Sequence, residues 1–292
     1  MTNGRLKGIY ITVFATALFI AAFHTLYMLG KSNFELAWIG AATSLIPATG
    51  LFMWLMIANV VRTSPNLTGI LIATYTGAAI SLIAWAIADP EALNPGLAFF
   101  YAAGPGATGF TIYVFWYSRF GRGENNILEV GKSLPEFSLE DIEGNEVISK
   151  SFRGKSALFM FYRGNWCPLC MAQIKEVAER YRELTENGVE VILVSPQSHD
   201  NTRSLANRYL VPFHFMVDVD NRAAKMLDIL NVAGTPLGVG VLGYEEDTVL
   251  PTVIMTNASG EIIYADLTDN YRIRPEPDVF IEIMRDKGGI AV

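Results

Sequence analysis

The sequence has 292 residues, of which 51% are hydrophobic and 17% are charged, and its formal net charge at pH 7 is −7. An acidic chain lacks the basic balance that is typical of nucleic-acid-binding proteins, so we expect no nucleic-acid partner. Its two cysteines and three histidines do not have the spacing of a four-ligand zinc site, so we expect no bound metal and no other cofactor.

The charge is distributed very unequally along the chain. Residues 1–122 contain six Lys/Arg and three Asp/Glu, which gives this part a net charge of +3. The remaining residues contain 16 Lys/Arg and 26 Asp/Glu, which gives them a net charge of −10. A short polar join at 120–126 separates the two parts. We therefore predict an α-helical membrane domain at 1–122, followed by an α/β domain at 128–292.

The first part contains four stretches without any Asp, Glu, Lys or Arg. Each is longer than the ~18 apolar residues that indicate a membrane-spanning helix. They lie near residues 8–30, 36–61, 67–88 and 97–118. Small residues at 40–44 favour close helix packing, and Pro105 predicts a kink in the fourth span. His24 is the one imidazole within a span, and an ionisable group there is a functional candidate, although no span contains an acidic partner for it.

The basic residues near the ends of these spans predict the orientation. With the N-terminus inside, five of them face the cytoplasm and one faces outward, because cytoplasmic loops carry the excess of Lys and Arg. The five are Arg5, Lys7, Arg62, Arg119 and Arg122, and the one is Lys31. Four spans would return the chain to the inner side. We therefore expect a multi-pass protein of the cell membrane whose second domain faces the cytoplasm.

Both cysteines lie within one short stretch, as Cys167 and Cys170. A disulfide that closes so short a loop hardly constrains the unfolded chain. We therefore expect the cysteine pair to take part in redox chemistry rather than to stabilise the fold. Residues 156–162 form an apolar run that predicts a buried strand, and residues 171–184 have the three-to-four spacing of an amphipathic helix. Pro168 is compatible with the first helical turn. The cysteines are therefore expected at a strand-to-helix turn, where the helix N-terminus lowers a thiol pKa.

The sequence Phe-Tyr-Arg-Gly-Asn-Trp-Cys-Pro-Leu-Cys at 161–170 resembles the motif of the peroxiredoxin-like branch (alkyl hydroperoxide reductase/thiol-specific antioxidant) of the thioredoxin-like superfamily. Residues 131–139 and 144–147 are similar to the N-terminal hairpin of that family. The resemblance covers the chain from about Leu128 onward. It implies a thioredoxin-like fold and a redox-active cysteine pair, with Trp166, Pro168 and Arg163 as supporting residues.

The motif combines features of two branches. In the peroxiredoxin resemblance Cys170 takes the attacking position, whereas the thioredoxin resemblance favours Cys167, and both assignments stay open. Near 250–252, where a peroxidase would carry an arginine, this chain has Pro251, and the thioredoxin resemblance implies a cis peptide bond before it, beside the cysteines. Arg163, Arg272 and Arg274 are candidate sources of positive charge for a thiolate.

The remaining pattern completes a central sheet covered by helices. Strands are predicted at 189–195, 213–217, 252–255 and 261–264, and helices at 201–209, 221–230 and 278–284. Residues 231–247 are glycine-rich and are predicted to be a loop and a candidate lid over the site. His199 and His214 are interpreted as structural residues.

These observations predict a membrane-anchored thiol-disulfide oxidoreductase or antioxidant protein that acts on peroxides or disulfides through Cys167 and Cys170. The expected partners are an external thiol reductant, either thioredoxin-like or glutathione, and the lipid bilayer. The alternative is a redox sensor in which oxidation of the pair alters the membrane domain without turnover.

Overall fold

The computed structural model describes residues 2–186 and 188–287. The chain divides into two compact units. Ile9–Arg119 form a helical unit, and Phe120–Val292 together with Met1–Gly8 form an α/β unit.

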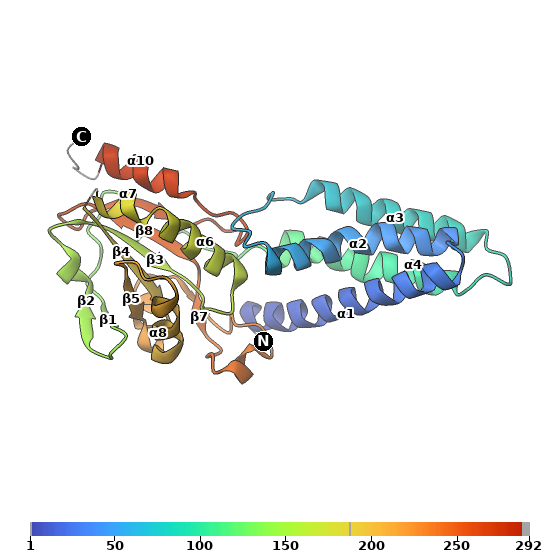
Figure 1. Cartoon of the computed structure of the whole chain (residues 1–292), viewed down its shortest axis with the longest axis horizontal. Helices are drawn as coiled ribbons and strands as arrows, with labels where there is room; N and C mark the ends of the chain where they lie inside the picture. Colours follow the sequence, from blue (N-terminus) through green and yellow to red (C-terminus); the bar gives the residue numbers. More distant parts are fainter. Residues whose placement is uncertain (1, 187, 288–292) are drawn as a thin grey trace. The chain divides into compact units, whose positions relative to one another are not determined.

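Among the described residues, three helices of the first part of the chain are long and apolar enough to cross a membrane (Figure 1). They are α1 (Asn3–Lys31), α2 (Leu36–Ile57) and α3 (Thr68–Ala86). They coincide with three of the four predicted spans.

The fourth predicted span is helical, but it is not one regular α-helix. It consists of α4 (Pro95–Tyr101), the π-helical segment η1 (Ala102–Gly109), α5 (Phe110–Ile112) and the π-helical segment η2 (Tyr113–Tyr117). Pro105 lies inside η1, and a proline has no N–H to donate to the preceding turn, which favours such a departure from α geometry. Three of the four predicted spans are therefore helices that are long and apolar enough to cross a membrane, and the fourth is not among these candidates.

Helices α2 and α3 approach each other backbone to backbone. A Cβ atom added at Gly77 would clash with the Gly40 carbonyl oxygen, so only glycine fits there. Ser81 Oγ donates to the Ala37 carbonyl at 2.7 Å, and Ser44 Oγ donates to the Ala102 carbonyl at 2.9 Å. The small residues predicted at 40–44 do allow the close packing expected of them.

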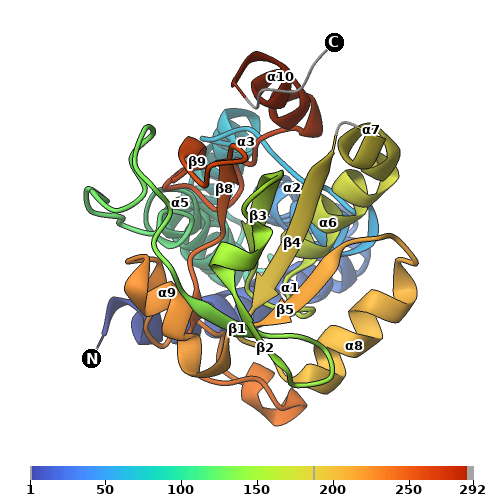
Figure 2. The ribbon, with the colours of Figure 1, turned by 90° about the vertical axis from the view of Figure 1, so that its left-hand side faces the viewer.

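The α/β unit is built on a seven-stranded sheet in the order β2-β1-β5-β4-β3-β8-β9 (Figure 2). The strands are β1 (Ser138–Glu140), β2 (Glu146–Ile148), β3 (Ser156–Phe161), β4 (Val189–Ser195), β5 (His214–Val217), β8 (Thr252–Thr256) and β9 (Ile262–Asp266). Strands β3, β4 and β5 are parallel, and β8 runs antiparallel to β3. This is the thioredoxin-like arrangement that the resemblance implied, with the β1–β2 hairpin preceding it.

Within the described residues, five α-helices follow the join in this unit. They are α6 (Pro168–Glu179), α7 (Tyr181–Glu186), α8 (His199–Arg208), α9 (Arg222–Met226) and α10 (Pro277–Lys287). The helix predicted at 171–184 starts earlier, at Pro168, and is interrupted at Arg180. The helix predicted at 221–230 ends at Met226, and Asp228 beyond it adopts the left-handed conformation that is incompatible with a helix.

The hydrophobic core lies against the central strands. Phe159 and Phe161 alternate along β3 and pack in one cluster with Ile192 and Val194 of β4 and with Phe137. All the residues of β3 are buried, which explains why this strand is an uninterrupted apolar run in the sequence. The strand therefore provides a rigid base for the turn that follows it.

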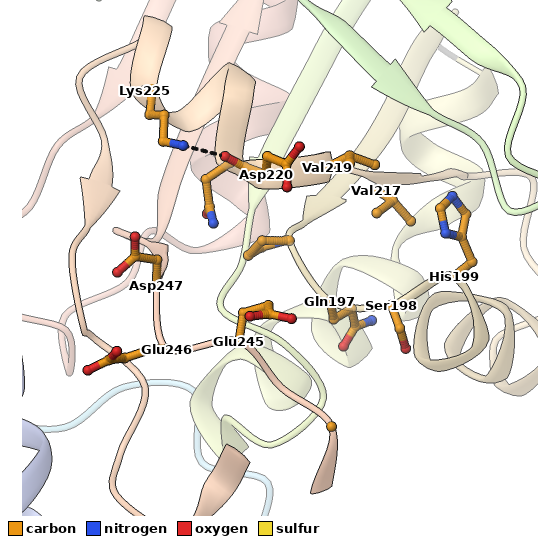
Figure 3. A pocket seen from close by; sticks show the side chains of 13 residues that line it. Gln197, Ser198, His199, Val217, Val219, Asp220, Lys225, Glu245, Glu246 and Asp247 are labelled. Carbon is orange, nitrogen blue, oxygen red and sulfur yellow. Dashed lines mark hydrogen bonds between the residues drawn. The ribbon is translucent and has the colours of Figure 1, made fainter. Parts of the chain in front are cut away.

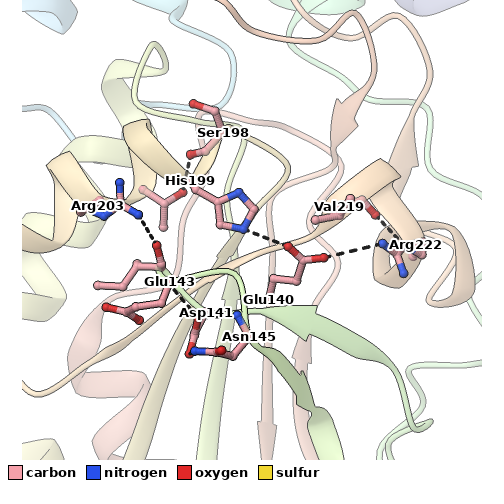
Figure 4. A network of polar contacts seen from close by, with 11 residues as sticks. Glu140, Asp141, Glu143, Asn145, Ser198, His199, Arg203, Val219 and Arg222 are labelled. Carbon is pink, nitrogen blue, oxygen red and sulfur yellow. Dashed lines mark hydrogen bonds and ion pairs between the residues drawn. The ribbon is translucent and has the colours of Figure 1, made fainter.

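The two histidines of this unit have structural partners. His199 Nε2 lies 3.0 Å from Glu140 Oε2, and Arg222 approaches the other oxygen of the same carboxylate at 3.9 Å (Figure 4). His214 Nε2 lies 2.8 Å from Glu190 Oε2. These contacts support their interpretation as structural residues.

Candidate active site

Both cysteines lie between β3 and α6. Strand β3 ends at Phe161, Cys167 is the N-cap of α6, and Cys170 lies in its first turn. Pro168 is the first helical residue, where its missing N–H costs no hydrogen bond. Both thiols are free and buried, with exposed fractions of 3% for Cys167 and 1% for Cys170. The predicted strand-to-helix position is confirmed.

The two thiols ionise very differently. For Cys170, burial opposes ionisation, but a hydrogen bond from Cys167, the charge of Arg274 and a backbone hydrogen bond at Arg163 outweigh it and lower the pKa to about 6. For Cys167, the hydrogen bond to Cys170 and then burial raise the pKa well above its usual range. Ionisation is therefore favoured on Cys170, and the protonated form is favoured on Cys167.

Two of the three candidate arginines supply positive charge to this thiolate. Arg163 and Arg274 are both buried, and both favour the ionised forms of the cysteines. The guanidinium carbon of Arg163 lies 4.6 Å from the ring centroid of Trp166, and its Nη2 donates to the carbonyl of Gly234. Arg272 is fully buried and lies two positions before Arg274 in the chain. Arg163 and Arg274 are therefore the candidate arginines whose charge acts on the cysteines.

Gln197 organises the turn and is a residue that our sequence reasoning missed. Its Oε1 accepts from the Asn165 backbone N–H at 2.9 Å, and its Nε2 lies 3.0 Å from Tyr162 Oη and 3.3 Å from Thr202 Oγ1. It is 3% exposed. It follows β4, and since the carboxyl ends of neighbouring parallel strands meet at one edge of a sheet, a polar side chain just after that strand was a recognisable candidate.

Tyr162 is part of the same environment. It is fully buried, and its pKa is raised, first by burial and then by the nearby negative charge on Cys170. The cysteine pair is thus enclosed by aromatic and cationic side chains rather than exposed to water.

The glycine-rich loop predicted at 231–247 is anchored at its base and contacts the turn. Its ends pair as the short strands β6 (Leu230–Asn231) and β7 (Thr248–Val249). A Cβ at Gly164, which has a φ of +137°, would lie 3.2 Å from the ring of Tyr244 and 3.0 Å from that of Trp166. Only glycine can therefore occupy position 164, and the loop lies against the redox motif.

Pro251 differs from the expectation. It is buried and directly precedes β8, whose Thr252 pairs with Phe161 at the end of β3. However, no peptide bond within the described residues is cis, so the predicted cis bond after Leu250 is wrong. The Pro251 carbonyl accepts from Arg122 Nη2 at 2.5 Å, so it is already used inside the fold. The thioredoxin resemblance therefore does not extend to the backbone conformation at Pro251.

A cavity of about 480 Å³ adjoins the site (Figure 3). Gln197 lines this cavity and also bonds Asn165 and Tyr162 of the redox motif. Acidic side chains of the loop, including Glu245 and Asp247, form another part of its wall. Gln197 therefore connects the cavity to the redox motif.

Sequence comparisons with known proteins agree with this chemistry. Residues 130–265 match the AhpC/TSA family. The thiol-disulfide oxidoreductase ResA of Bacillus cereus is 29% identical over 126 residues, which cover 43% of this chain and 69% of that protein. The chloroplastic peroxiredoxin Q of Sedum lineare is 30% identical over 95 residues, covering 32% of this chain and 51% of that protein. Among solved structures, Enterococcus faecalis AhpC is similar with a TM-score of 0.44 at 18% identity, over 56% of this chain and 98% of that one.

The family match and the sequence relatives identify a thiol-dependent oxidoreductase. Residues 130–265 form an AhpC/TSA family domain, and the motif that first indicated this family lies within the matched region.

Proposed function

We propose that this chain is a membrane-anchored thiol-disulfide oxidoreductase with antioxidant activity, in which Cys167 and Cys170 cycle between dithiol and disulfide. The observation that carries the proposal is the pair of free thiols at the start of α6, one with a pKa lowered to about 6. Only a thiolate attacks a disulfide or a peroxide, and Cys170 is largely in that form at neutral pH.

The reaction begins at Cys170. Its thiolate attacks one sulfur of a substrate disulfide, so that a mixed disulfide forms as the substrate S–S bond breaks and the departing sulfur leaves as a thiolate. With a peroxide, attack on one oxygen breaks the O–O bond and leaves a sulfenic acid on Cys170, and the departing alkoxide or hydroxide takes a proton from water to become an alcohol or water. Cys167 then loses its proton and attacks the Cys170 sulfur, which yields the Cys167–Cys170 disulfide. The bond from Cys170 to the substrate sulfur breaks and the second substrate thiol leaves, or the S–O bond of the sulfenic acid breaks and its hydroxide leaves as water with the Cys167 proton. An external thiol, thioredoxin-like or glutathione, returns the two electrons.

The order of attack can be tested by trapping. In Cys167→Ser, the remaining Cys170 thiolate should form a stable mixed disulfide with a protein or glutathione disulfide, because no resolving thiol remains. The introduced serine hydroxyl can still donate a hydrogen bond to the thiolate. In Cys170→Ser, the remaining thiol has the raised pKa, and trapping at neutral pH should be much slower. The opposite ranking would assign the attack to Cys167.

Membrane anchoring is supported by the outer surfaces of the apolar helices. Large apolar side chains on α1 and α3 are well exposed, including Ile20 at 62%, Phe23 at 67% and Ile72 at 62%. Exposed apolar surface of this extent is unfavourable in water and fits a lipid environment.

The contacts of the N-terminal residues support an even number of membrane crossings by the chain. Residues 1–8 belong to the same compact unit as the redox domain, and Arg5 Nη2 forms an ion pair with Glu246 Oε1 at 2.5 Å. Two segments that pack together lie on one side of the membrane, so the chain between them crosses it an even number of times. The segment 95–117 therefore serves as the fourth crossing in our proposal, and the excess of basic residues favours the cytoplasm for both ends.

The second candidate function, a redox sensor, is favoured by one chain of contacts. Arg163 donates to Gly234, and the loop that contains Gly234 also reaches Gly8, where the Leu237 N–H lies 3.4 Å from the Gly8 carbonyl oxygen. A change at the cysteines is thus connected to the start of the first apolar helix. A sensor would be oxidised and reduced without sustained turnover.

The deciding experiment is an assay of the purified full chain with reduced thioredoxin as donor. Hydrogen peroxide, an organic hydroperoxide and a protein disulfide serve as parallel oxidants. We expect multiple turnovers with at least one of them, and loss of turnover in Cys167→Ser and Cys170→Ser. A single stoichiometric oxidation with every oxidant would favour the sensor instead.

A further inference from the structure

One loop of the α/β unit exposes apolar side chains that its own fold does not bury. Residues 231–244 contain no Asp, Glu, Lys or Arg. Within this loop Leu237, Val241 and Leu242 have exposed fractions of 61%, 89% and 68%. Val241 and Leu242 belong to the short 3₁₀ turn η5 (Val239–Leu242), which holds them together on one short segment. We call Leu237, Val241 and Leu242 the apolar tip.

The loop that carries the apolar tip packs directly on the beginning of α1. A Cβ atom added at Gly4 would clash with the carbonyl oxygen of Val232. A Cβ atom added at Gly8 would lie 3.1 Å from the carbonyl oxygen of Thr235. The Leu237 N–H also lies 3.4 Å from the Gly8 carbonyl oxygen. Gly4 and Gly8 are about one helical turn apart, so both glycines lie on one face and let the loop backbone approach the helix closely.

Gly8 is also where the first apolar stretch starts. From residue 8 to residue 30 the chain has no charged side chain, and α1 continues without a break from the turns that hold the loop into that stretch. A spanning helix enters the bilayer where its apolar stretch begins. The loop is therefore attached to the chain at the depth of the membrane surface.

We propose that the apolar tip inserts into the interfacial region of the bilayer that the apolar helices span, so that the redox domain has a lipid contact of its own. The inference rests on the membrane anchoring proposed above. Apolar side chains beside an entering helix gain free energy by leaving water for the acyl boundary. The same loop supplies the Gly234 carbonyl that holds Arg163 and the Tyr244 ring that covers Gly164, so the lipid contact involves a segment that also shapes the redox site.

The proposal can be tested by site-directed spin labelling of the full chain in phosphatidylcholine vesicles. Cys167 and Cys170 are first replaced by serine, and single cysteines are then introduced as Val241→Cys or Leu242→Cys. Power saturation with oxygen, which concentrates in lipid, and with a water-soluble nickel chelate reports the environment of each label.

Two control positions bracket the expected signal. Ile20→Cys lies on the exposed surface of α1, within the first apolar stretch. Leu210→Cys is matched to Val241 in exposure, at 91%, but it precedes β5. Leu210 therefore lies at the edge of the sheet where the parallel strands begin. The loop that carries the apolar tip contacts the turn after β3, at the opposite edge, where these strands end.

We expect the labels at 241 and 242 to be more accessible to oxygen than to the nickel chelate, with values between those at 20 and 210. If position 20 reports lipid but positions 241 and 242 are as accessible to nickel as position 210, the inference is overturned while the membrane anchoring stands. Labels at 241 and 242 that neither reagent reaches would overturn it in favour of a protein partner or a second copy of the chain. If position 20 itself reports water, the membrane anchoring fails and the inference fails with it.

Discussion

Arg163 stacks on Trp166 with its guanidinium carbon 4.6 Å from the ring centroid, in the turn that carries the cysteines. The stack holds a buried positive charge where its field stabilises the Cys170 thiolate. An arginine suits this position because its planar group both stacks on an aromatic ring and stays protonated when buried. Arg274 adds a second positive charge from a distant part of the chain.

Removing the positive charge of Arg274 should make the thiolate form of Cys170 less stable relative to its thiol form. In Arg274→Gln we expect the pKa of Cys170 to rise by roughly one unit, because a nearby opposite charge typically lowers a pKa by about one to three units. The ultraviolet absorbance of the thiolate as a function of pH measures this. Arg222→Gln, which removes a cation paired with Glu140 on the same unit, is the control and should leave the pKa unchanged. Equal pKa values in all three proteins would show that Arg274 does not act on the site.

The pH dependence of the reduced protein should carry the signature of Cys170. Its pKa is about 6 in the folded protein and close to the ordinary 9.0 in the unfolded chain. The unfolded state therefore binds more protons between these values, and the free energy of unfolding should rise with pH from about 6 to about 9. Chemical denaturation of the reduced protein at several pH values measures it. In Cys170→Ser this rise should disappear, and an unchanged slope would contradict the low pKa.

The sequence contains two glutamines, Gln173 and Gln197, which form a natural pair of test and control. Both are 3% exposed, but Gln197 bonds the turn whereas the Gln173 Nε2 has no hydrogen-bond partner within the described residues. Gln197→Leu should cost ~1–3 kcal/mol of unfolding free energy, since it removes the buried Gln197 amide and leaves the partly buried Asn165 N–H without its acceptor. Gln173→Leu should cost less than ~1 kcal/mol. Equal losses on denaturant unfolding would mean that the network does not stabilise the turn.

Topology can be measured independently of activity. We expect an alkaline phosphatase fusion after Val292 to be inactive and a green fluorescent protein fusion at the same point to be bright, because our proposal has both ends in the cytoplasm. Fusions at the N-terminus should report the same side. Opposite sides for the two ends would require an odd number of crossings, and would show that 95–117 does not serve as a crossing.

Much of the fold was predictable because its signals are local. The uninterrupted apolar strand β3 and the amphipathic α6 were visible as patterns of spacing, and the position of the cysteine pair followed from their junction. The break at Arg180 and the early end of α9 were not, because backbone conformation at single positions such as Asp228 has no periodic signal.

The surroundings of the cysteines were harder to predict, because they come from separate parts of the chain. Gln197 reaches the turn from the end of β4, and Arg274 acts from beyond β9, so their roles depend on the tertiary fold. The conformation at Pro251 was predicted wrongly because a motif that suggests one branch of a superfamily does not specify every backbone detail of it. Arg122, which bonds the Pro251 carbonyl, lies in the join between the two domains and gave no sign of this role.

The central claim is that Cys167 and Cys170 form a reversible disulfide with each other. The direct measurement is mass spectrometry of the full chain, alkylated after mild treatment with diamide or peroxide and again after reduction with a dithiol. We predict that oxidation blocks both cysteines from alkylation through an intramolecular Cys167–Cys170 bond, and that reduction restores both. If both thiols remain open to alkylation after oxidation, the redox account of this protein is wrong.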